Sequence, residues 1–284
     1  MSLPEHWIGQ FAALGEQHET FVVPYRYGDC GWFDDQPMSP IYPVALWSLS
    51  MQQEDWDRIE YIRRESQYDW NRVIAFRNKE DAGHEQPWVR FLVGEHPSYP
   101  DEMLRTSYSL VCWRLTQVRE DQEAATHHDV QHWQYLNPVV TEALIQLTLG
   151  APQLIYNGGL LMTRVRYVDA DRGRPGLPQD VAALVEKLES DRTVLRLVNL
   201  SPFQTRAVIV QAGAFGEHRF TEARYTVQTS AYPGPIGTYA APALNTETRT
   251  VPVHENQLQV HLPPGLEILL DLGTARFVNH PSYV

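Results

Sequence analysis

Three histidines and an aspartate lie close together in residues 125–133, ATHHDVQHW, and such side chains can bind a metal ion or transfer protons. If this stretch is helical, His128 and His132 lie four residues apart on one helix face, which is the spacing that zinc sites use. A third ligand has to come from elsewhere, because the chain contains no HExxH motif. The nearest candidates in the sequence are His84, Glu85, Glu95 and His96.

The favoured interpretation of this stretch is a polar connector, in which the imidazoles cap or hydrogen-bond the ends of the flanking helices. On that interpretation we expect no cofactor. A divalent metal ion on His128 and His132 is the alternative hypothesis, and it implies a metal-dependent enzyme.

A second group of reactive side chains is acidic, because Asp29, Asp34 and Asp35 lie in YGDCGWFDDQP, residues 27–37, which we predict to be a loop. Hydrolysis of a glycosidic bond generally uses two carboxyl groups about 5 to 10 Å apart on opposite sides of that bond. We pair Asp34 or Asp35 with Glu142, because a carboxylate on a mostly apolar helix costs free energy unless it is paired or catalytic. The alternative is a turn of solvated acids, with Glu142 paired to an arginine.

Aromatic and amide side chains near these acids are expected to contact a substrate. The loop 229–248 is long for a connection between strands, and long ordered loops are often binding loops. Its alternative role is to cover a sheet edge or to contact the helical part. The expected substrate-binding residues are Trp32, Trp133, Asn157, Tyr232 and Tyr239.

The first half of the chain is rich in tryptophan and follows the period of an α-helix. Helices are predicted over 39–51, 54–66, 100–121 and 137–150. In 100–121 the apolar residues recur every three or four positions, which predicts a buried face of Leu104, Tyr108, Val111, Leu115 and Val118. In the last helix Asn137 is the expected N-cap and Gly150 the expected stop.

After Gly150 the period changes to two, and seven short segments rich in β-branched residues are predicted to be antiparallel strands. Residues 251–262 are expected to form a hairpin that turns at Glu255 and Asn256. One helix, residues 177–190, is expected to interrupt the strands. We therefore predict two domains with an α+β fold, a helical domain over 1–150 and an antiparallel β-sandwich over 151–284.

Composition limits the partners of the chain. The net charge is −12 and 20% of the residues are charged, so nucleic acid and anionic membranes should be repelled. Neither a secretion signal nor a membrane-spanning segment is visible, so we expect a cytoplasmic protein. Cys30 and Cys112 are too few for a disulfide scaffold.

Trp-rich helices followed by antiparallel strands resemble bacterial carbohydrate-active proteins that join an α/α toroid to a C-terminal β-sandwich. The resemblance is carried by GWFDDQPMSPIYPVALW, YLNPVVTEALIQLTLGAPQLIYNGG and VLRLVNLSPFQTRAVIVQAGAFGEH. The helices are far fewer than a complete toroid needs. The helical part is therefore either a smaller bundle or a partial toroid whose open flank is covered by another copy or another protein.

The leading hypothesis for function is a carbohydrate-active enzyme, a glycoside hydrolase or a lyase, that binds a small molecule or an oligosaccharide between the helical loops and the β-domain. The first alternative is a non-catalytic binding or assembly subunit, which predicts a homo-oligomer or a partner protein that covers the helical half. The second alternative is the metal-dependent enzyme that uses His128 and His132. No GxSxG, P-loop, GxGxxG or CxxC motif is present, which argues against ordinary α/β-hydrolases, NTPases, dinucleotide enzymes and thioredoxin-like proteins.

Overall fold

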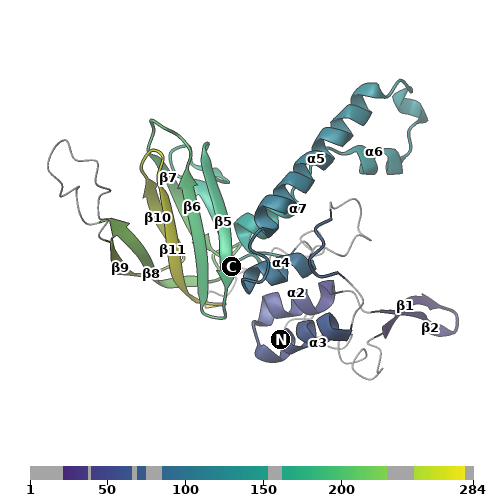
Figure 1. Ribbon diagram of the computed structural model, residues 1–284, viewed down its shortest axis with the longest axis horizontal. Coiled ribbons are helices and arrows are strands. Elements are labelled where there is room, and N and C mark those ends of the chain that lie inside the picture. Colours follow the sequence, from purple (N-terminus) through teal and green to yellow (C-terminus); the bar gives the residue numbers. More distant parts are fainter. Residues whose placement is uncertain are drawn as a thin grey trace, which may run out of the picture. The chain divides into compact units, whose positions relative to one another are not determined.

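The structure is a computed structural model of the 284-residue chain. It describes residues 22–37, 40–65, 69–74, 85–152, 162–228 and 246–278. The chain divides into two compact units, Met1–Met162 and Thr163–Val284. The described helices longer than one turn lie in the first unit and two antiparallel sheets lie in the second, so the predicted two-part α+β layout is confirmed (Figure 1).

The core of the first unit forms where apolar helix faces meet. Ile59, Trp88 and Tyr99 are fully buried, and Trp47 packs edge-to-face on Trp56 with 5.0 Å between the ring centroids. None of the helices in the described ranges has the length and hydropathy needed to cross a bilayer. The helices are α2 (Ile41–Ser50), α3 (Gln53–Glu65), α4 (Glu85–Leu92), α5 (Tyr99–Glu120), η1 (Ala125–His127), α6 (Val130–Leu136), α7 (Glu142–Leu144) and η2 (Ile145–Leu149).

The face of α5 that we predicted to be buried is largely exposed. Tyr108 is 71% exposed and Leu104, Leu115 and Val118 are also exposed. The helix packs instead through a different stripe, whose buried members are Tyr99, Met103, Ser107 and Arg114. The prediction was wrong because a periodic apolar pattern shows that one face can be buried, but not which face the neighbouring elements cover.

The helix predicted over 137–150 is shorter than expected. Asn137 ends α6, and its side-chain oxygen accepts a hydrogen bond from the backbone N–H of Val139 rather than capping a new helix. Regular structure begins only at Glu142 and continues into η2, a π-helical turn, which ends at Gly150 with φ 64°, as predicted for a glycine stop.

The acidic stretch that we predicted to be a loop is a β-hairpin. Strand β1 (Val22–Gly28) pairs antiparallel with β2 (Gly31–Pro37), and Gly28 faces Gly31 across the turn. Gly31 has φ 96°, a conformation that glycine adopts without steric cost. Asp34 and Asp35 therefore lie on a strand, and Asp29 lies in the turn of the hairpin.

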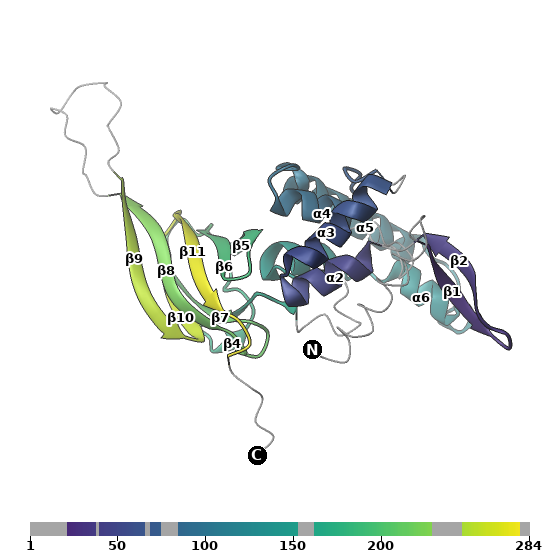
Figure 2. The same cartoon turned by 90° about the horizontal axis from the view of Figure 1, so that it is seen from below.

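The second unit contains a four-stranded sheet in the order β10-β7-β3-β4 and a five-stranded sheet in the order β5-β6-β11-β8-β9 (Figure 2). All seven strands predicted from the sequence are present. Burial alternates along β6, where Thr193, Leu195, Leu197 and Asn199 are buried and their neighbours are not. The strands are β3 (Val165–Asp169), β4 (Arg174–Pro175), β5 (Val181–Leu188), β6 (Arg192–Asn199), β7 (Arg206–Ala212), β8 (Arg219–Gln228), β9 (Thr246–Glu255), β10 (Gln257–Leu262) and β11 (Glu267–Ala275).

The helix predicted over 177–190 is wrong, because these residues form the edge strand β5. A β-bulge between Val185 and Lys187 shifts the alternation by one residue. Val181, Val185 and Leu188 are therefore the buried positions of the strand. Their spacings of four and three are those of a helix face, which explains the error.

The predicted hairpin over 251–262 is also wrong. Strand β9 pairs with β8 in the five-stranded sheet, whereas β10 pairs with β7 in the other sheet. The chain therefore crosses between the two sheets at Asn256, whose backbone oxygen accepts a hydrogen bond from the N–H of Ala212 at 2.9 Å. Period and turn residues do not show which sheet a strand joins.

Candidate metal centre

The connection between α5 and α6 brings the histidine-rich stretch back toward the end of α5. Asp121 terminates α5 with an extended backbone, and α6 starts after Asp129, whose carboxylate accepts the backbone N–H of His132 at 2.9 Å. The stretch is therefore not one helix, as the metal hypothesis assumed. His128 is extended before the N-cap and His132 lies in the first turn of α6.

This capped turn places the two imidazoles together. The rings of His128 and His132 stack with 3.6 Å between their centroids and 9° between their planes. Their Nε2 atoms lie 3.1 and 3.2 Å from the same oxygen, Oδ2 of Asp121. Candidate ligand atoms of the three residues all lie within 4.8 Å of one another, so Asp121 is a candidate third ligand that the sequence did not identify.

The side chain of His128 is only 5% exposed, and its buried Nδ1 has no hydrogen-bond partner among the residues that the structure describes. Its Nε2 lies 3.1 Å from Oδ2 of Asp121, which is an ion-pair distance. Unsatisfied polar atoms in a buried position cost free energy. Tetrahedral ligands about 2.0 to 2.2 Å from zinc lie roughly 3.4 Å apart. The separations of 3.1 and 3.2 Å from Oδ2 of Asp121 are ion-pair distances and lie close to this value.

The charge state of Asp121 suits a metal ligand. The backbone N–H of Glu123, which donates to Oδ1 at 2.9 Å, lowers the pKa of the Asp121 carboxyl, and the nearby imidazoles of His128 and His132 lower it further. The carboxyl is therefore ionised at neutral pH and offers Oδ2 as an anionic ligand.

One side of this cluster faces solvent. The Glu123 side chain is 70% exposed, and its Oε2 atom lies 3.7 Å from Nε2 of His128. Trp133 packs edge-on against both imidazoles, with centroid distances of 5.3 and 5.2 Å, and is itself 52% exposed. The cluster thus has an acidic group and an aromatic wall beside an accessible edge, which an enclosed structural site does not have.

The third ligands suggested by the sequence have other surroundings. His84 lies outside the described residues. Glu95 pairs with Arg63 at 2.8 Å, and Nε2 of His96 lies 3.5 Å from Glu102 at the start of α5. Glu85 is buried in α4, and its charge adds to the effect of burial, which raises the pKa of Tyr99.

Two of the three proposed catalytic acids, Asp34 and Glu142, lie near a basic group. Asp34 has φ 64° on β2, and its Oδ2 lies 3.2 Å from Nε of Arg26 on the neighbouring strand. The Glu142 charge acts on Arg114 in α5, opposing the lowering of the Arg114 pKa by burial. For Asp35 the structure describes the backbone, which pairs with Pro24.

The expected substrate-binding residues are described only in part. Trp32 is 58% exposed on the hairpin and contacts Tyr27 edge-on at 5.3 Å. Trp133 lies at the histidine cluster, as described above. Asn157, Tyr232 and Tyr239 lie outside the described residues, as does the loop between β8 and β9.

Residues 2–145 match a family described as a domain of unknown function (DUF8034). The chain belongs to this family. Asp121, His128 and His132 all lie inside the DUF8034 match, whereas both sheets of the second unit lie beyond it. Neither the curated proteins nor the solved structures contain a match to the chain.

The sequence contained a usable signal for Asp121. It is the last residue of the long amphipathic helix predicted over 100–121, and His128 follows seven positions later. A helix, a short turn and a second helix often form an antiparallel pair, which brings the end of one helix near the start of the next.

Proposed function

We propose that the DUF8034 part of the chain binds one divalent transition-metal ion through Asp121, His128 and His132 and is a metal-dependent hydrolase. The observation that carries the proposal is the convergence of two imidazole nitrogens and one carboxylate oxygen within 4.8 Å. Imidazole and carboxylate ligands together suit zinc and neighbouring transition metals better than calcium or magnesium.

Three protein ligands leave further coordination positions open, which is typical of catalytic rather than structural zinc sites. A bound ion would supply Lewis-acid activation of water. Glu123 is placed to accept a proton as a general base, because its carboxylate is exposed and close to His128. Trp133 would form one wall of the substrate site.

Binding requires a small rearrangement of the two histidines. An ion must lie near the plane of each ligating ring, so His128 and His132 have to tilt away from their parallel stacking. Because Trp133 contacts both rings, its fluorescence should change when the ion binds. This gives a signal for binding that does not depend on activity.

The carbohydrate-active hypothesis remains our second proposal. The alternative was a turn of solvated acids with Glu142 paired to an arginine. Asp34 forms an ion pair with Arg26, and the charge of Glu142 acts on Arg114, which favours this alternative over a pair of catalytic carboxyl groups. The exposed aromatic rings on the hairpin and at the histidine cluster still suit a sugar ligand. We also infer that the two sheets pack face to face as a sandwich, and the alternating burial of β6 supports this.

The test uses the full chain without a histidine tag, titrated with Zn²⁺ and assayed with 4-nitrophenyl acetate and bis(4-nitrophenyl) phosphate. Zn²⁺ should quench or shift the tryptophan emission, and Trp133→Phe should remove that change. Hydrolysis should require Zn²⁺, and Glu123→Gln should keep the ion but lose about 100-fold or more in rate.

His261→Ala is the matched control, because His261 is exposed on β10 in the second unit. It should behave as the unaltered chain does. Zn²⁺ binding that survives in His132→Ala would contradict the site. Binding without any hydrolysis that depends on Glu123 would contradict the catalytic part and leave a binding function.

A further inference from the structure

The second unit contains an open pocket of about 460 Å3, which is within the size range of small-ligand sites. Its walls come from the β3–β4 turn with Arg172, the β4–β5 connection with Gln179 and Asp180, and the β6–β7 loop with Phe203. The pocket lies outside the residues matched by the family, so it is separate from the metal site proposed above.

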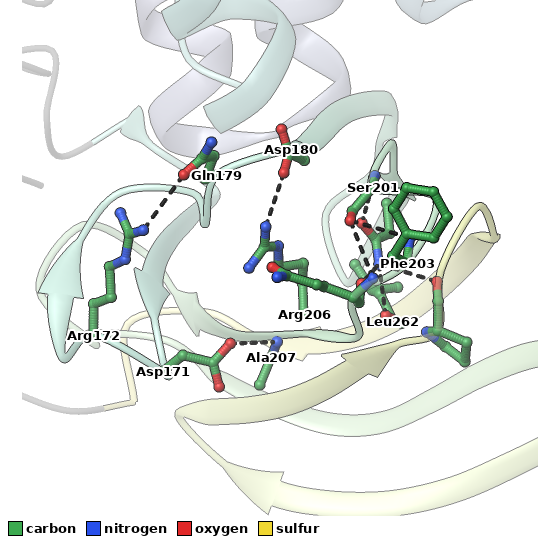
Figure 3. Close-up of polar contacts among 12 residues, drawn as sticks. Asp171, Arg172, Gln179, Asp180, Ser201, Phe203, Arg206, Ala207 and Leu262 are labelled. Atoms are coloured by element: carbon green, nitrogen blue, oxygen red, sulfur yellow. Dashed lines mark hydrogen bonds and ion pairs between the residues drawn. The ribbon is translucent and has the colours of Figure 1, made fainter.

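Two arginines in this pocket have donors available for a ligand. Nη2 of Arg172 donates only to the neutral amide oxygen of Gln179, at 3.4 Å, and Arg172 forms no ion pair with any described residue. Arg206 lines the same pocket, where its Nη2 is held by Asp180 at 2.8 Å and 16% of its side chain remains exposed. Figure 3 shows both guanidinium groups extending toward the connection that carries Gln179 and Asp180.

The charge of the pocket differs from that of the chain. Two arginines and one aspartate give its lining a net charge of +1, whereas the whole chain carries −12. A single negative charge on a ligand would therefore be balanced. Asp180 would oppose a doubly charged phosphate beside Arg206, but it can accept hydrogen bonds from hydroxyl groups.

Phe203 provides an apolar surface at the same pocket. It is 88% exposed, and the loop that carries it is fixed by Ser201, whose Oγ accepts the backbone N–H of Gln204 at 3.1 Å. Ser201 is itself held, because its backbone N–H donates to the side chain of the fully buried Asn199 at 3.0 Å. The aromatic ring is thus presented from a rigid turn (Figure 3).

An acidic sugar combines the features that this lining requires. A pyranose ring has an apolar face of C–H groups that can stack on an aromatic ring, and its hydroxyl groups donate to and accept from amides and carboxylates. A uronic acid adds one carboxylate, and arginine binds carboxylates in a planar two-point contact.

We propose that this pocket binds a uronic acid residue of an acidic oligosaccharide. The guanidinium groups of Arg172 and Arg206 bind the carboxylate, Asp180 and Gln179 accept hydroxyl groups, and Phe203 stacks on the sugar ring. The second unit is then a binding module that holds an acidic glycan independently of the metal site.

The test is isothermal titration of the full chain with the tetramer of galacturonic acid, with maltotetraose as the neutral sugar and inorganic phosphate as the anion without a ring. We expect the galacturonate tetramer to bind and the other two probes to bind at least about tenfold more weakly. Phe203→Ala and Arg172→Gln should each weaken galacturonate binding by about tenfold or more.

The matched controls are Phe215→Ala and Arg249→Gln, since both residues are exposed in the same unit but do not line the pocket. Both should bind the tetramer as the unaltered chain does. The proposal is overturned if the tetramer does not bind, if phosphate or maltotetraose binds equally well, or if the two pocket variants keep full affinity. None of these outcomes bears on Zn²⁺ binding, which is measured separately.

Discussion

Replacing Asp121 by asparagine should weaken zinc binding strongly without disturbing the fold. Four-ligand zinc sites bind with about 10 to 16 kcal/mol, so one protein ligand contributes roughly 3 to 4 kcal/mol. At about 1.4 kcal/mol for each factor of ten, the Kd should rise by roughly 100- to 1,000-fold. The variant is mild, because asparagine keeps an oxygen that can accept the N–H of Glu123, as Oδ1 of Asp121 does at 2.9 Å.

The assay is competition of Zn²⁺ between the full chain and a chelating dye at constant pH, with the melting temperature of the metal-free protein recorded in parallel. Asp129→Asn is the matched control, since it removes the same charge from the same turn and asparagine caps a helix as well as aspartate. A Kd for Asp121→Asn within a factor of about three of the Asp129→Asn value would refute the reasoning.

Further predictions concern stability and assembly. Burial, followed by the charges of Arg164 and Arg276, lowers the pKa of His218 to about 4. The free energy of unfolding should therefore fall by roughly 3 kcal/mol as the pH falls from about 6.5 to 4, because protonation of His218 favours the unfolded chain. In denaturant titrations, the free energy of unfolding of His218→Gln should depend less on pH over this range. Asn199→Ala should lower the free energy of unfolding by about 2 to 4 kcal/mol, because the fully buried amide nitrogen of Asn199 lies within hydrogen-bond distance of three backbone oxygens. A decrease of less than about 0.5 kcal/mol would contradict this prediction. The exposed apolar face of α5 predicts that a second copy of the chain covers the helical part. Sedimentation should therefore show a dimer or a larger oligomer, and Leu115→Glu should shift the protein toward the monomer. A monomeric unaltered chain would contradict this prediction.

Much of the fold follows from the periods of the sequence. The change from helical to alternating spacing near Gly150 marks the start of the two larger sheets, although the β1–β2 hairpin lies before it, and the seven alternating segments are all strands. The misassigned elements involve information that is not local. The bulge at Val185 gives β5 the spacing of a helix face, and the crossover at Asn256 depends on which strand each neighbour pairs with.

The sequence predicted which two histidines belong to the candidate metal site, but not how their rings are arranged. The spacing of His128 and His132 suggested a shared helix face, whereas the rings meet because Asp129 caps α6 at the position between them. Asp121 joins them only because the chain reverses after α5. Asp121 and His132 are eleven positions apart in the sequence, and local sequence patterns do not show that they are close in the fold.

The metal content of the full chain tests the proposed site most directly, with the protein expressed without a histidine tag in zinc-supplemented medium and analysed by mass spectrometry after gel filtration. We expect close to one transition-metal ion per chain, and only traces in the His128→Ala and His132→Ala double variant. Equal trace amounts in both proteins would show that Asp121, His128 and His132 do not form a metal site.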